Sequence, residues 1–139
     1  RDGLVTGVQT CALPIYEARK FSEEQWNTVF KVMEGERDFK VFAKEPHRYE
    51  STVCNLTQIR ALSLPEIPAT VLYFKANRFL YNMIRRMVGF AFFTLLRQIN
   101  VPSSFEELIG DYGKWATQRA PANGLYLYRT YLLEELKQV

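Results

Sequence analysis

The chain has 139 residues, of which 47% are hydrophobic and 14% aromatic, enough for the core of one domain and too many for a disordered segment. Its net charge of +3 is too small to indicate nucleic-acid binding by itself. Two cysteines and one histidine predict no disulfide framework and no metal site, which favours a reducing, cytoplasmic setting. The longest apolar run, residues 87–96, is too short to span a membrane.

Residues 1–15 differ from the rest of the chain. They show neither helical nor strand periodicity, and the run from Val8 to Ile15 resembles translated sequencing-adapter read-through. We therefore expect a non-native leader over residues 1–15, followed by one domain over residues 16–139. A genuine flexible N-terminus is the alternative.

A helix is predicted over residues 22–34. Ser22 and Gln25 form a capping box, and Gly35 supplies a left-handed stop. The apolar residues at helical spacing are Trp26, Val29, Phe30 and Met33. Residues 38–42 then read as a short linker that places one or two aromatic side chains in the core.

Two strands follow this linker. Residues 49–63 alternate between apolar and polar side chains, with one irregularity that suggests a bulge. Residues 64–68 contain two prolines and read as a turn, and residues 70–76 are rich in β-branched and aromatic side chains. We expect the two strands to pair as an antiparallel hairpin.

The remaining pattern predicts a long helix, a short helix and a last strand. Apolar residues at helical spacing over residues 79–100 predict the long helix, which Pro102 would end. Ser104 and Glu107 form a second capping box that would begin the short helix. Residues 114–122 include an Ala-Pro-Ala turn, and residues 124–133 alternate as a strand. The order predicts an α+β fold, an antiparallel sheet with helices packed on one face.

The long helix and its approach are basic. Residues 75–97 hold five basic residues and no acidic one. Arg85 lies one turn after Tyr81 and Asn82 and one turn before Gly89. A glycine at mid-helix is costly, so we expect a close neighbour there. Spacing alone favours a structural ion pair for Arg85, with an anion-binding role as the alternative.

Three motifs resemble the TruA-type tRNA pseudouridine synthases. The first is Phe79–Gly89 with the preceding Lys75–Asn77, the second is Ala120–Leu127, and the third is Gly35–Phe42. They stand in the family's order, and the resemblance covers about residues 21–133. It implies the fold of the C-terminal half of such an enzyme, which isomerises uridine to pseudouridine in the anticodon arm of tRNA.

The resemblance also implies roles for single residues. Arg85 matches the arginine that pairs with the catalytic aspartate, and Leu125 matches the leucine that packs near the base. Lys75, Arg78 and Arg86 become candidates for phosphate contacts, which position RNA without reading its sequence. The family further implies tRNA as partner, a homodimer when full length, and no cofactor, metal or membrane.

One departure is as informative as the match. The family's nucleophilic aspartate lies in a Gly-Arg-Thr-Asp-like motif, and nothing here resembles it. The three aspartates, Asp2, Asp38 and Asp111, stand in other contexts. We therefore expect a fragment that is inactive alone. A non-catalytic RNA-binding module and a purely structural domain are the alternatives.

Overall fold

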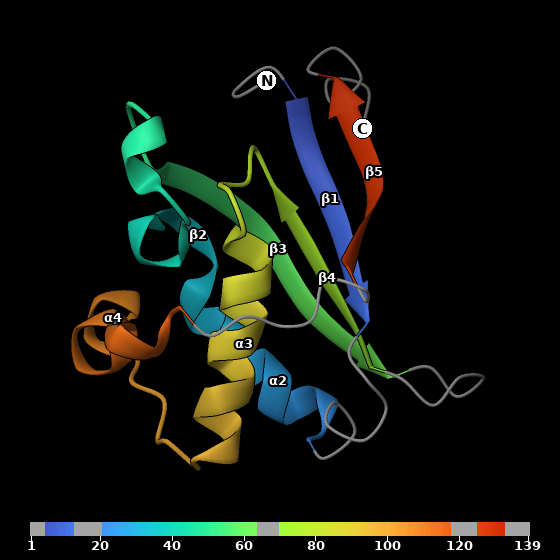
Figure 1. Ribbon diagram of the computed structural model, residues 1–139. Helices are drawn as coiled ribbons and strands as arrows, with labels where there is room; N and C mark the ends of the chain where they lie inside the picture. The colour runs from blue at the N-terminus through green and yellow to red at the C-terminus, as the bar shows by residue number, and fades with distance from the viewer. Residues whose placement is uncertain (1–4, 13–20, 64–69, 118–124, 133–139) are drawn as a thin grey trace.

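The computed structural model describes residues 5–12, 21–63, 70–117 and 125–132, with side chains for residues 21–63 and 70–117. In these parts of the chain five strands form one antiparallel sheet in the order β2-β3-β4-β1-β5 (Figure 1). The strands are β1 (Val5–Ala12), β2 (Gly35–Asp38), β3 (Val53–Ser63), β4 (Thr70–Ala76) and β5 (Leu125–Leu132).

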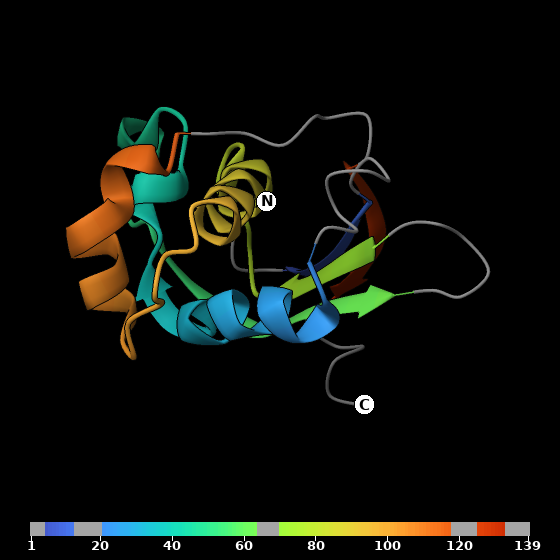
Figure 2. The ribbon, with the colours of Figure 1, turned by 90° about the horizontal axis from the view of Figure 1, so that it is seen from below.

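The helices within the same residues are α2 (Glu23–Met33), α3 (Met83–Leu96) and α4 (Phe105–Tyr112), with short 3-10 turns η1 (Lys40–Phe42), η2 (Pro46–Arg48) and η3 (Gly113–Trp115). Seen from below, α3 lies over one side of the sheet and α2 runs along its border (Figure 2). The predicted α+β class, an antiparallel sheet with helices against it, is confirmed. None of the described helices is long and apolar enough to cross a bilayer.

Two strands were not predicted. Residues 5–12, which show no strand periodicity in the sequence, form β1, and β1 pairs with β4 on one side and with β5 on the other. Residues 35–38, part of which read as a linker, form β2 and pair with β3. Strands depend on hydrogen bonds to neighbours that are distant in the chain, so the local pattern of residues 5–12 and 35–38 is a weak signal.

The first helix forms as predicted. Ser22 and Gln25 make both hydrogen bonds of the capping box. Its predicted apolar stripe is buried, with Trp26, Val29, Phe30 and Met33 all inaccessible to solvent. Gly35 follows the C-cap with a φ of +113°, so it supplies the expected stop and also begins β2.

The outer edge of β3 is covered in two ways. Its first part, up to Leu56, pairs with β2. Beyond that point side chains of α2 and of its C-cap residue cover the edge: Glu34, the C-cap, accepts from the N–H of Ile59 at 3.0 Å, and Asn27 of α2 both accepts from and donates to Ala61, at 2.8 and 3.4 Å. An open strand edge promotes pairing with other chains, so α2 serves as both a core helix and an edge cover.

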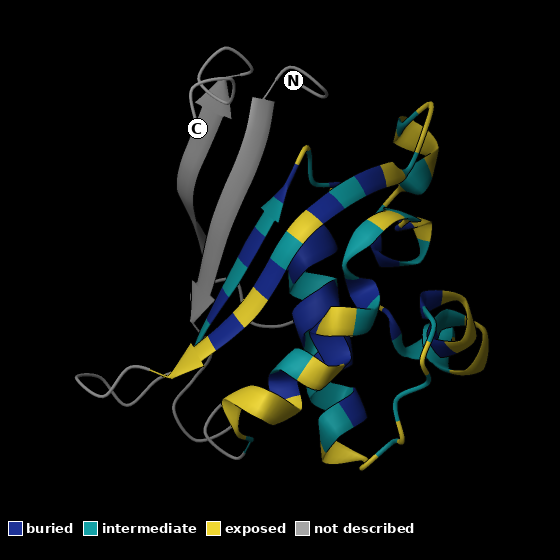
Figure 3. Ribbon diagram, turned by 180° about the vertical axis from the view of Figure 1, so that it is seen from behind, coloured by how far each residue is buried: buried dark blue, intermediate teal, exposed yellow. Residues whose placement is uncertain are grey.

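The predicted hairpin and its bulge are confirmed. Strands β3 and β4 pair antiparallel, and the register shifts between Leu56 and Gln58. The shift places Leu56, Ile59 and Ala61 all on the buried side, although a strict alternation would separate them. Figure 3 shows buried and accessible residues alternating along these two strands.

The long helix is shorter than predicted at both ends. It begins at Met83 rather than Phe79, because Asn82 has a left-handed φ of +61°. It ends at Leu96, well before Pro102, because Gln98 is also left-handed. The N–H of Gln98 donates to the carbonyl of Leu95 at 3.1 Å and that of Ile99 to Thr94 at 3.0 Å, which closes the last turn.

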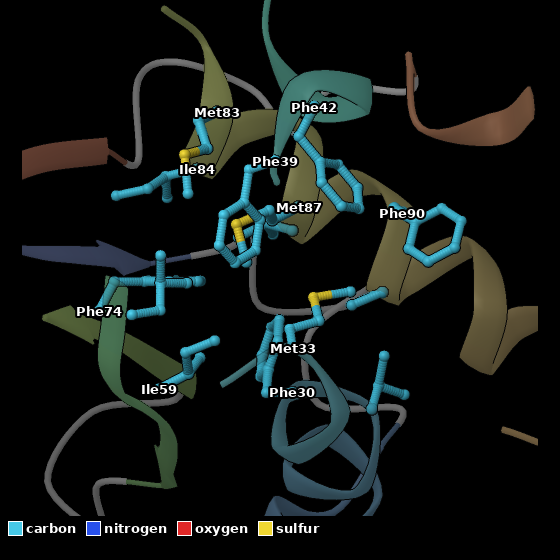
Figure 4. Close-up of a cluster of buried hydrophobic side chains, with 14 of the residues drawn as sticks. Phe30, Met33, Phe39, Phe42, Ile59, Phe74, Met83, Ile84, Met87 and Phe90 are labelled. Atoms are coloured by element: carbon cyan, nitrogen blue, oxygen red, sulfur yellow. The ribbon is translucent and has the colours of Figure 1, made fainter. Parts of the chain in front are cut away.

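The core lies between the sheet, α2 and α3 (Figure 4). Phe30 of α2 meets Phe74 of β4 edge to face at 5.4 Å, and Phe42 of η1 meets Phe90 of α3 at 5.5 Å. Phe39 and Phe42 are fully buried, which confirms that residues 38–42 place aromatic rings in the core. Each buried ring contributes roughly 1.5–3 kcal/mol, so the segment after β2 is fixed firmly against α3.

The second half of the chain follows the predicted order. Ser104 caps α4 by accepting from the N–H of Glu107 at 3.1 Å. A strand was predicted over residues 124–133, and β5 occupies Leu125–Leu132. The predicted turns at residues 64–68 and 120–122 lie outside the described residues.

Candidate functional site

The end of β4 is tied to β3 just before the basic helix. The N–H of Asn55 donates to the side-chain oxygen of Asn77 at 2.8 Å, and the N–H of Asn77 donates to the carbonyl of Asn55 at 3.2 Å. This reciprocal pair fixes the point where the chain leaves the sheet. Five residues later the left-handed Asn82 turns it into α3.

The first turn of α3 is unusual in its charges. Asn82 makes no side-chain capping bond, and the turn contains no acidic residue. Arg85 and Arg86 lie there instead, both half-buried. The N-terminal end of a helix carries about half a positive charge, which normally favours carboxylates. The two guanidinium groups therefore add positive charge to an end of the helix that is already positive.

Arg86 and Arg78 are held by backbone carbonyls. Arg86 donates from Nη1 to the carbonyl of Ala43 at 3.0 Å. Arg78 donates to the carbonyl of Ser51, and its guanidinium lies 5.9 Å from the centroid of the Tyr49 ring. Both arginines therefore dock the segment between β2 and β3 onto the entry to α3 (Figure 1).

Lys75 lies on a different face from these arginines. Along β4 the buried residues are Thr70, Leu72, Phe74 and Ala76, and Lys75 alternates with them. Because successive strand residues point to opposite faces, Lys75 is on the side of the sheet away from the core. The structure thus gathers Arg78, Arg85 and Arg86 around the start of α3 and leaves Lys75 apart.

Leu125 is the first residue of β5, opposite Cys11 of β1. Its side chain lies outside the described residues, as does most of the Ala120–Leu127 motif. The expected close neighbour of Gly89 is likewise not among the described contacts.

The described aspartates have structural surroundings. Asp38 accepts from the N–H of Lys40 at 3.0 Å and from the hydroxyl of Thr52 at 2.6 Å, so its carboxylate shapes the turn after β2. A shallow pocket of about 380 Å³ opens beside it. Asp111 is exposed on α4. Within the described part of the chain no three side chains of the metal-binding types come together.

Sequence reasoning missed a second group of charged residues beside α3. Lys44 and Arg48 lie 5.3 and 5.1 Å from the centroid of the Tyr81 ring. The signal available was the run Lys44-Glu-Pro-His-Arg-Tyr49, a basic and aromatic loop that no periodicity explains. Its docking beside α3 became visible only in the fold.

The comparisons with known proteins agree with this fold. A family described as tRNA pseudouridine synthase matches residues 29–131. The tRNA pseudouridine synthase A of Porphyromonas gingivalis is 29% identical over 119 residues, which cover 85% of this chain and 47% of the relative. That of Leuconostoc citreum is 36% identical over 98 residues, covering 67% of this chain and 36% of the relative.

An α+β fold in which α3 carries Arg85 and Arg86 in its first turn thus coincides with a family match over most of the chain. The chain belongs to the tRNA pseudouridine synthase family. It spans between about a third and a half of the length of the curated relatives it matches.

Proposed function

We propose that this chain is the C-terminal, arginine-bearing part of an enzyme that isomerises uridine to pseudouridine in the anticodon arm of tRNA. The observation that supports it most directly is the family match over residues 29–131, joined to a helix whose positive end carries Arg85 and no acidic residue.

The reaction moves one bond on the target nucleotide. The target uridine leaves its stack, and an aspartate attacks the nucleotide. The bond between the ribose and N1 breaks, the uracil turns, and the ribose becomes bonded to C5. The hydrogen on C5 is released and N1 gains a hydrogen, so the product is an isomer of the substrate.

In this proposal Arg85 binds the carboxylate of the nucleophilic aspartate. A guanidinium can hold a carboxylate through two parallel hydrogen bonds and favours its ionised form. The N-terminal end of α3 adds to that effect. Leu125 forms an apolar wall against the base, and Arg78, Arg86 and Lys75 contact phosphates. Arg78 and Arg86 are already oriented by their bonds to Ser51 and Ala43.

The nucleophilic aspartate belongs to a segment outside these residues. Asp38 is engaged in its turn, and neither Asp38 nor Asp111 stands in the family's aspartate motif. We also propose that residues 1–15 are a foreign leader, that the complete enzyme is a cytoplasmic homodimer with tRNA across both subunits, and that it needs no metal.

The test follows the hydrogen lost from C5. Transfer RNA labelled with tritium at C5 of uridine is incubated with the purified chain and with a longer protein that contains the segment encoded in frame upstream of Tyr16 at an intact locus. We expect tritium release from the longer protein and none from the chain alone. Release by the chain alone would show that its nucleophile lies within these residues.

Arg85 is tested in the longer protein. Arg85→Met should lower tritium release at least a hundredfold, the order expected when a positioned electrostatic partner is removed. Arg97→Met, which removes an exposed arginine at the other end of α3, is the control. A longer protein that binds tRNA and releases no tritium favours the alternative, a non-catalytic RNA-binding module.

A further inference from the structure

The loop between β2 and β3 binds the backbone of Tyr81, two residues before the start of α3. The N–H of Tyr81 donates to the hydroxyl of Tyr49 at 2.9 Å, and the carbonyl of Tyr81 accepts from the N–H of Lys44 at 2.9 Å. Both backbone groups of Tyr81 are therefore bonded to the same loop. This fixes the Tyr81 ring relative to Lys44 and Arg48.

The Tyr81 ring contacts two cationic side chains, Lys44 and Arg48. The Nζ of Lys44 and the guanidinium of Arg48 each lie just over 5 Å from the ring centroid, so they are no more than about 10 Å apart. A cation over an exposed aromatic ring gains about 0.5–1 kcal/mol. Two like charges on one ring repel each other, so the arrangement retains unmet attraction for an anion.

Nearby carboxylates do not neutralise this pair. Glu45 and Glu50 belong to the same loop, and among the described residues neither Lys44 nor Arg48 lies within ion-pair distance of a carboxylate. The segments 43–51 and 78–86 together hold five basic residues and two acidic ones. The positive end of α3 adds to the same field.

A second cluster of cations on aromatic rings lies at the opposite end of α3 and can be compared with the cluster at Tyr81. Arg97 lies 4.7 Å from the centroid of Phe93, and Lys114 lies 4.6 Å from that of Trp115. Those two rings are 4.8 Å apart. That cluster lies at the C-terminal end of α3, whose partial negative charge offsets the cations, whereas the charges beside Tyr81 are reinforced.

We propose that Lys44, Arg48 and Tyr81 form a binding site for the phosphate backbone of tRNA, separate from the arginine that faces the reaction. Tyr81 is 39% exposed, and a ring of that kind also offers a surface on which an unstacked base can lie. The site rests on the proposed function, since the anion it takes is the backbone of the tRNA substrate.

The site lies where an extended substrate would meet it. Tyr81 precedes α3 by two residues and Arg85 follows in its first turn, so the two residues are four positions apart in the chain. A strand whose target nucleotide is held at Arg85 can thus place flanking phosphates on Lys44 and Arg48. The site formed by Lys44, Arg48 and Tyr81 would position the tRNA and would take no part in the bond changes of the reaction.

The experiment measures tRNA affinity of the 139-residue chain as a function of salt. Each phosphate contact contributes about 0.7–0.9 to the slope of log affinity against log salt. The double variant Lys44→Gln/Arg48→Gln should lower that slope by about 1.5 and weaken binding about tenfold to thirtyfold near 0.15 M salt. The control, Arg97→Gln/Lys114→Gln, removes the same charge and the same kinds of ring contact.

Failure of the proposed phosphate-binding site and failure of the proposed function give different results. Equal losses in the test and control variants would overturn the site and reduce it to a general charge effect. A wild-type chain that does not bind tRNA at all would count against both the site and the proposed function. Tritium release by the longer protein would then show whether the function alone survives. Tyr81→Leu, which keeps both charges, should weaken binding without changing the slope; unchanged binding would exclude the ring.

Discussion

The hydroxyl of Tyr49 accepts a hydrogen bond from the backbone N–H of Tyr81, 2.9 Å away and 32 residues along the chain. This contact joins the loop that follows β2 to Tyr81, two residues before the start of α3. It sets the position of the basic loop against the helix, so it links the sequence-distant parts of the candidate site.

Tyr49→Phe tests this contact. The variant keeps the ring and removes the one acceptor, so we expect a loss of about 0.5–1.5 kcal/mol in the free energy of unfolding, measured by urea denaturation. Tyr73→Phe is the matched control: Tyr73 is half-buried in β4, and its hydroxyl has no hydrogen bond among the described residues. Equal effects of the two changes would contradict the role of the contact.

Arg86→Met separates two roles for Arg86. If its main part is to hold the Ala43 carbonyl, the free energy of unfolding should fall by about 1.5–3 kcal/mol, the range for a hydrogen bond from a charged group, with little change in the salt slope of tRNA binding. A lower slope with unchanged stability would assign it to phosphate contact instead. Thermal unfolding and the salt titration of tRNA binding together distinguish the two roles of Arg86.

Asn27→Ala should open the edge of β3. Asn27 is the side chain that bonds both backbone groups of Ala61, so we expect a loss of about 1–3 kcal/mol in the free energy of unfolding and more aggregation on storage. Thr28→Ala is the neighbouring control, since Thr28 bonds only the carbonyl of Glu24 within its own helix. Light scattering and urea denaturation report the two effects, and a soluble, fully stable Asn27→Ala protein would refute them.

Two glycines should respond to alanine with opposite signs. Gly35 has a φ of +113°, so Gly35→Ala should destabilise the fold by about 1–2 kcal/mol although the nearest atom stands 3.7 Å from the new Cβ. Gly110 lies inside α4 with nothing within 4 Å of a Cβ, so Gly110→Ala should stabilise it by about 0.5–1 kcal/mol. Melting temperatures moving the same way would show that backbone conformation is not the cause.

Several elements could be predicted because their signals are local. The capping box at Ser22, the buried stripe of α2, the bulge in β3 and the cap at Ser104 each depend on residues within a few positions of one another. The start of α3 could not, because Asn82 adopts a left-handed conformation that its neighbours along the chain do not demand. The contacts of Tyr81 with the distant loop residues Lys44 and Tyr49 accompany that conformation.

Some residues of the candidate site could likewise be found from the sequence, and others only from the fold. Arg85 could be singled out by its motif, and the structure places it in the first turn of α3. Lys75 was grouped with the arginines by sequence proximity, yet strand alternation puts it on the other face of the sheet. Lys44 and Arg48 were passed over because they lie some forty positions from α3 along the chain, and only the fold brings them to the Tyr81 ring.

By itself the sequence determined the family, the α+β class and the helix that carries Arg85, since these depend on motifs and on hydrophobic periodicity. Tertiary structure alone decided the places of β1 and β2 in the sheet, the covering of the β3 edge by α2 and the pairing of Lys44 with Arg48 on one ring. The physical reason is that hydrogen bonds between strands and contacts between loops join residues far apart in the chain, so neither partner reveals the other in its local pattern.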